Sequence, residues 1–158
     1  MLYLAANYVW PTLIQISLML LGWVVIYLCC HAIGHWLVGR LVGIRFQGYG
    51  VRGTDQPISY PPGMRQIMSA LPLLTIVTRK DSMTAASRTA KAFMFGAGEI
   101  SSTLVSIGAA WYAWQAGLAG GQILLIAVTI WSTAALAASF FTPRGDFAKA
   151  RNALRMTG

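Results

Sequence analysis

The chain has 158 residues, enough for one domain, and it is 56% hydrophobic and 10% charged, compared with about 25% charged residues in an ordinary soluble domain. Its formal net charge of +8 would by itself permit nucleic-acid binding, but residues 1–39 have no charged side chain and residues 92–143 have only Glu99. Because a membrane span needs about 20 mainly apolar residues, the sequence predicts an integral membrane protein without a nucleic-acid partner.

The first long apolar segment is predicted to form a helix over about residues 11–42. Pro11 suits the first helical turn and Gly43 suits the position just beyond the last one. A helix of about 30 residues exceeds the thickness of a bilayer, so it is tilted, bent or extends beyond the membrane. No basic segment precedes the apolar run, which therefore indicates a retained helix rather than a signal peptide.

Residues 43–91 differ in character and form a predicted cytosolic surface region. Alternating apolar residues with glycines and prolines over 44–61 predict short strands or an extended hairpin at the membrane surface. Residues 63–78 are apolar in part but too short for a span, and they predict an interfacial or re-entrant segment. Residues 81–91 are polar and predicted to be helical.

Two further apolar helices are predicted over about residues 92–114 and 122–141, followed by a short tail helix over 146–156. Eight of the twelve basic residues lie between Arg40 and Lys91, and the other four follow residue 143. Basic loops favour the cytosolic side of a membrane. The fold class predicted is thus a multi-pass, all-α membrane protein of one domain, residues 1–158, with three transmembrane helices, a small hairpin, an outer N-terminus and a cytosolic C-terminus.

Two histidines, His31 and His35, stand four residues apart near the end of the first apolar helix. This spacing places both imidazoles on one helix face, as in the H-E-x-x-H zinc motif, but Ala32 stands where that motif has glutamate. Counting 1.5 Å per residue places His31, His35 and Glu99 roughly 8–14 Å below the cytosolic end of their helices. Asp146, just beyond the third helix, can complete a His₂Asp zinc set with one open position. Asp146 alone would equally suit the N-cap of the tail helix.

Four segments in this order resemble motifs of the site-2 protease family of intramembrane zinc metalloproteases. They are His31–Phe46 for the first motif, 47–53 for the membrane-surface strand, Phe95–Gly98 for the glycine-rich middle helix and Pro143–Asp146 for the third zinc ligand. The resemblance implies Zn²⁺ bound by His31, His35 and Asp146. It also implies binding and hydrolysis of a transmembrane or unwound peptide in a cell membrane such as a bacterial inner membrane.

Ala32 replaces the general base of that family, whose loss typically lowers a rate by about 10²–10⁴. The chain is then a natural pseudoprotease or an inactivated enzyme, or else Glu99 supplies the missing base or a fourth metal ligand. The sequence leaves two other functions open. One is a non-catalytic subunit or adaptor that contacts lipid and a partner helix, and the other is a haem- or pigment-binding membrane protein. Oligomeric state is not indicated by the sequence.

Overall fold

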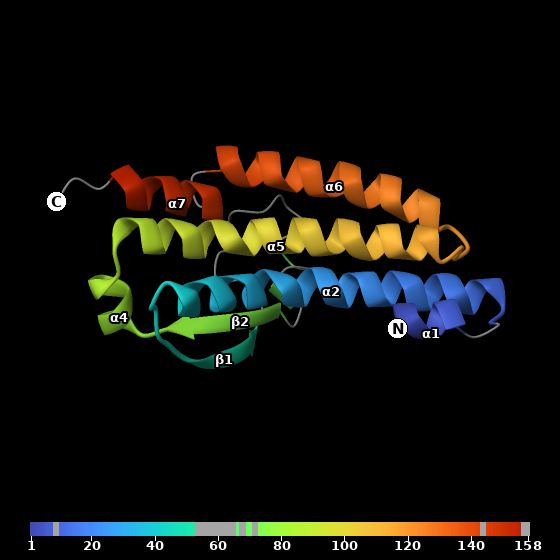
Figure 1. Ribbon diagram of the computed structural model, residues 1–158, viewed down its shortest axis with the longest axis horizontal. Coiled ribbons are helices and arrows are strands. Elements are labelled where there is room, and N and C mark those ends of the chain that lie inside the picture. The colour runs from blue at the N-terminus through green and yellow to red at the C-terminus, as the bar shows by residue number, and fades with distance from the viewer. Residues whose placement is uncertain (8–9, 53–65, 67–68, 71–72, 143–144, 156–158) are drawn as a thin grey trace.

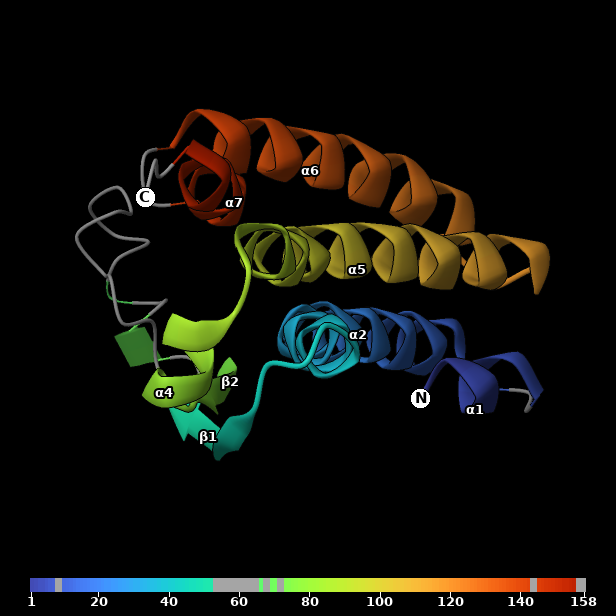
Figure 2. The same cartoon turned by 60° about the vertical axis from the view of Figure 1, so that its left-hand side comes forward.

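The computed structural model describes residues 1–7, 10–52, 66, 69–70, 73–142 and 145–155. Most of them are helical. The elements in chain order are α1 (Leu2–Asn7), α2 (Thr12–Leu41), β1 (Phe46–Arg52), β2 (Leu73–Thr78), α4 (Lys80–Ala85), α5 (Arg88–Gln115), α6 (Gly121–Phe141) and α7 (Asp146–Arg155). Figures 1 and 2 show α2, α5 and α6 side by side, with α5 in the middle.

The expectation of three helices of transmembrane length is confirmed. Among the described residues, three stretches are long and apolar enough to cross a membrane, and they begin at Thr12, Arg88 and Gly121. The middle helix starts four residues earlier than the predicted residue 92, because the Ser87 hydroxyl caps it by accepting a hydrogen bond from the Ala90 backbone N–H. The predicted polar helix over 81–91 is therefore split into α4 and the first turn of α5.

The last turn of α2 ends as the sequence predicts, at a glycine. Gly43 has a φ of 86°, and its N–H donates to the Arg40 carbonyl while the Ile44 N–H donates to the Gly39 carbonyl. This pair of hydrogen bonds is the Schellman arrangement, which satisfies carbonyl groups at a helix end. Ile44 is 1% exposed and fixes the chain as it turns toward β1.

The short strand predicted within residues 44–61 is present as β1. Its described partner is β2, with which it pairs antiparallel, so that Tyr49 lies opposite Ile76. The sequence did not predict that residues 73–78 form a strand, since it assigned them to an interfacial or re-entrant segment; most of the remainder of 63–78, like 53–61, lies outside the described residues. The run Leu73–Thr78 is rich in β-branched side chains, which favour a pleated surface. The sequence also did not predict α1, whose Leu2 and Ala6 pack against the core cluster around Met19.

The sheet lies beside the C-terminal part of α2 (Figure 1). The rings of Trp36 and Tyr49 are 6.1 Å apart between centroids, and a Cβ on Gly39 would press against the Phe46 ring. Beyond the sheet, α4 starts with an ion pair of 2.9 Å between Arg79 and Asp81. The hydrogen bond from Arg79 holds the pKa of the exposed Asp81 carboxyl below its ordinary value.

Helices α2 and α5 approach each other closely at Gly34 of α2. A Cβ at this position would lie 2.7 Å from the Ala97 carbonyl oxygen and 2.7 Å from the Ser101 Cβ. The Ser101 hydroxyl lies within hydrogen-bonding distance of two carbonyl oxygens, 2.9 Å from that of Cys30 on α2 and 3.0 Å from that of Gly98 on α5. Small residues and hydroxyls of this kind hold helices together in an apolar medium. The contact lies within one turn of both histidines.

We expect Gly34→Ala to destabilise the fold by about 1–3 kcal/mol, because the added methyl group has no space between the two helices. Thermal unfolding of the purified chain in detergent measures the effect. Gly108→Ala on α5 is the matched control, since its Cβ would have no neighbour within 4 Å. The control should gain about 0.5–1 kcal/mol from helix propensity, and equal melting temperatures of the two variants would contradict the close contact.

Candidate metal centre

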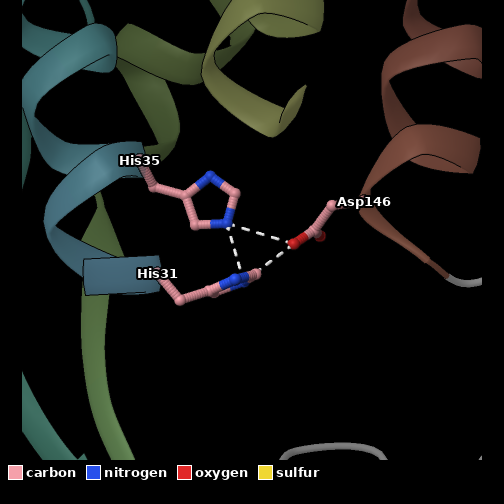
Figure 3. Close-up of side chains that lie close together, drawn as sticks. All are labelled: His31, His35 and Asp146. Atoms are coloured by element: carbon pink, nitrogen blue, oxygen red, sulfur yellow. Dashed lines mark hydrogen bonds and ion pairs between the residues drawn. The ribbon is translucent and has the colours of Figure 1, made fainter. Parts of the chain in front are cut away.

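Three side chains from two distant parts of the chain meet at one point (Figure 3). The Asp146 Oδ2 atom lies 3.0 Å from His31 Nε2 and 3.1 Å from His35 Nε2, and the two Nε2 atoms lie 3.2 Å apart. The histidines are on α2, and Asp146 is the first residue of α7. Among the described residues these three form the group of potential metal ligands, with their ligand atoms within 4.8 Å of one another.

Glycines in the middle helix α5 leave the space in which these three side chains meet. A Cβ on Gly98 would overlap the imidazole ring of His35. Two residues earlier along the helix, a Cβ on Gly96 would lie 3.8 Å from the Phe147 ring of α7, which is an ordinary contact. The glycine-rich segment therefore lets α2 bring its imidazole up to the α5 backbone on one side, while α7 packs close by.

The protonation of His35 is set by a backbone group. Its Nδ1 lies 2.6 Å from the Met94 carbonyl oxygen, and a carbonyl can only accept, so Nδ1 carries the proton and donates it. A neutral imidazole then has a lone pair on Nε2, pointed at the other two residues. A second hydrogen bond that fixes the tautomer in this way is typical of histidines that bind metals.

The three facing atoms, two imidazole nitrogens and one carboxylate oxygen, have too few protons between them for every close pair to form a hydrogen bond. His31 Nε2 can donate one proton, but His35 Nε2 and Asp146 Oδ2 both present lone pairs at 3.1 Å. Either an additional proton or a cation must relieve that repulsion. Two imidazoles and one carboxylate suit Zn²⁺, and tetrahedral bonds of 2.0–2.1 Å would separate neighbouring ligand atoms by roughly 3.3 Å. The observed separations of 3.0–3.2 Å fit such an ion.

The group is enclosed on one side only. The side chains of His35 and Asp146 are 12% and 11% exposed, whereas that of His31 is 38% exposed. Three protein ligands with an accessible side leave room for a fourth, exchangeable ligand. The arrangement can thus hold a metal ion and present it to another molecule.

Lys149 is a site residue that the sequence analysis missed. Its Nζ donates to the Asp146 Oδ1 atom at 2.8 Å, from one turn further along α7. The spacing of three residues between an acidic and a basic side chain on a predicted helix is the signal that could have found it.

The structure places the two candidate bases differently. Ala32 lies between the two histidines in sequence and has no ionisable side chain. It is 3% exposed and therefore has little contact with solvent. Glu99 is half-buried on α5, directly after Gly98, and it does not belong to the described group of ligand atoms. Its role as a substitute base stays a prediction.

Comparisons of the chain with protein-family models, with curated proteins and with solved structures found no match.

We expect Gly98→Ala to weaken Zn²⁺ binding by about 10-fold or more, because the new methyl group displaces the His35 ring and breaks its hydrogen bond to Met94. Titration of the metal-free protein in detergent with Zn²⁺ measures the affinity. Gly96→Ala, two residues away on the same helix, should bind like the wild-type chain. Equal affinities in both variants would contradict the position given to His35.

Proposed function

We propose that the protein is a membrane-embedded, site-2-protease-like zinc protein that binds a transmembrane or unwound peptide, and that Ala32 leaves it without the base needed for efficient hydrolysis. The observation that carries the proposal is the His31, His35 and Asp146 cluster, in which ligand atoms 111 residues apart lie 3.1 Å from each other. Ionisable groups enclosed between apolar helices are costly unless they are paired or hold a metal, and the convergence of two imidazoles on one carboxylate oxygen supports a metal site.

The membrane assignment rests on the three apolar helices and on the distribution of charge. Long apolar side chains such as Leu37, Leu104 and Ile130 are 50%, 65% and 66% exposed on α2, α5 and α6. Such surfaces suit lipid better than water. The basic residues of 40–91 and of the C-terminal tail favour a cytosolic position for this end of the bundle, with the N-terminus outside.

When bound, Zn²⁺ supplies a Lewis acid that polarises a carbonyl group and acidifies water. The residues of this chain do the remaining work. Met94 fixes the His35 tautomer, Asp146 adds a negative charge, and His31 forms the accessible side at which a peptide can approach. Ala32 provides no proton acceptor beside the metal. Glu99, directly after Gly98 on α5, is the acidic residue that could take this role.

The same geometry is compatible with a non-catalytic role as a subunit or adaptor, for which a retained peptide-binding site without a base is sufficient. The geometry of the two imidazoles does not favour a haem or pigment protein. The two Nε2 atoms are only 3.2 Å apart and converge on the same carboxylate oxygen. Imidazoles that converge on one point suit a single small ion rather than the face of a planar macrocycle.

Metal analysis tests the zinc centre directly. We expect the protein purified in detergent to bind one Zn²⁺ per chain and Asp146→Ala to lose most of it, because one ligand and its charge are removed. Asp81→Ala is the matched control, since it removes an equally acidic but exposed side chain that pairs with Arg79. A wild-type chain that retains no zinc at micromolar concentrations would refute the centre.

Ala32→Glu tests the missing base. If the remainder of an active site is present, the variant should cleave a single-span peptide reconstituted with it about 10²–10⁴ times faster than the unaltered chain. Ala32→Glu combined with His35→Ala should abolish the gain. Ala32 is 3% exposed, so zinc content and melting temperature must accompany the assay. A folded, zinc-loaded Ala32→Glu that still cleaves nothing would favour the adaptor.

A further inference from the structure

The two oxygen atoms of the Asp146 carboxylate have different partners. Oδ2 lies within 3.1 Å of both imidazoles, whereas Oδ1 accepts a hydrogen bond from Lys149 Nζ at 2.8 Å. An ionised carboxylate can bind a metal through one oxygen or through both, and it rotates readily between these modes unless something holds it. Here one oxygen is already engaged by an ammonium group.

We propose that Lys149 is a positioning residue that restricts Asp146 to one metal bond, through Oδ2, and so keeps a coordination position open for the peptide. This inference rests on the proposed zinc centre and adds a determinant of its coordination number. A bidentate Asp146 would fill the position that a catalytic or peptide-binding metal must offer.

Two contacts restrict the ammonium group of Lys149, whose side chain is 43% exposed. The side chain extends back along α7 from three residues after Asp146, and Nζ lies 5.8 Å from the centroid of the Phe95 ring on α5. It therefore contacts the helix that also carries Met94 and Gly98. A lysine that is fixed to the carboxylate and to an aromatic face has fewer rotamers to explore than a surface lysine.

Charge alone predicts the opposite effect of this residue on metal binding. A fixed ammonium group near a divalent cation repels it, so removal of the ammonium should strengthen binding if electrostatics dominates. If positioning dominates, removal should weaken binding, as loss of an outer-shell partner of a metal ligand does. The sign of the change in affinity therefore separates the two explanations.

The experiment uses the full chain in detergent, stripped of metal and loaded with Co²⁺ or Zn²⁺. Lys149→Met removes the charge and the donor while preserving length, and Lys149→Arg restores both. Lys91→Met is the control for net charge, because Lys91 contacts the Thr84 carbonyl instead. Arg151→Met is the control for docking of α7, since Arg151 lies over the Phe140 ring.

We expect the wild-type chain, Lys149→Arg and both controls to show the intense visible absorption of four-coordinate Co²⁺. Lys149→Met should show the weaker spectrum of a higher coordination number and bind Zn²⁺ about 10–100-fold less tightly. An unchanged spectrum or tighter binding in Lys149→Met would overturn the inference and leave the zinc centre standing. Failure of the wild-type chain to bind Co²⁺ or Zn²⁺ would overturn both.

A measurement on the unaltered protein covers the case in which Lys149→Met does not fold. X-ray absorption of the zinc-loaded wild-type chain reports the number of ligand atoms around the metal. We expect four, with a single short bond to a carboxylate oxygen. Five ligands with two carboxylate oxygens would show that Lys149 does not restrict Asp146, and the inference would be wrong.

Discussion

The close approach of α2 and α5 is the contact on which the rest of the site depends. At Gly34 the two backbones come too near for even a methyl group, and at Gly98 the His35 ring rests on bare backbone. The Ser101 hydroxyl lies between carbonyl oxygens of both helices and so fixes the position of α2 along the axis of α5. Because the Met94 carbonyl belongs to the same stretch of α5, this contact also determines which nitrogen of His35 carries the proton. The same contact therefore sets both the packing of the two helices and the hydrogen bonding of a candidate metal ligand.

Helix α5 also positions the third candidate ligand, Asp146, because α7 packs on it. Gly145, directly before α7, packs against the end of α6, since a Cβ on it would lie 3.0 Å from the carbonyl carbon of Ser139. Helix α7 then packs on the first half of α5 (Figure 2), with Lys149 over Phe95. Asp146 at the start of α7 thereby reaches the imidazoles of α2. The two ligand-bearing helices need not interact strongly with each other, because both are positioned by the helix between them.

Four ionisable side chains in this cluster satisfy one another, in a chain whose apolar segments 1–39 and 92–143 carry Glu99 as their one charged side chain. His31 and His35 face one oxygen of Asp146, and Lys149 holds the other. Such grouping lowers the cost of placing charges among apolar helices. Ala32, the residue directly after His31, contributes no ionisable group. The cluster could therefore hold a metal ion without a general base at that position.

The sequence by itself determined the apolar helices, the end of α2 at Gly43 and the histidine pair, because these depend on local composition and on spacing within one helix. Asp146 could be proposed as a partner only by counting depth, since its approach depends on how α7 packs against α5. Two features were decided by tertiary structure alone: the pairing of β1 with residues 73–78 and the proton on His35 Nδ1. Each joins atoms whose proximity no periodicity encodes, because it arises only when separate elements pack together.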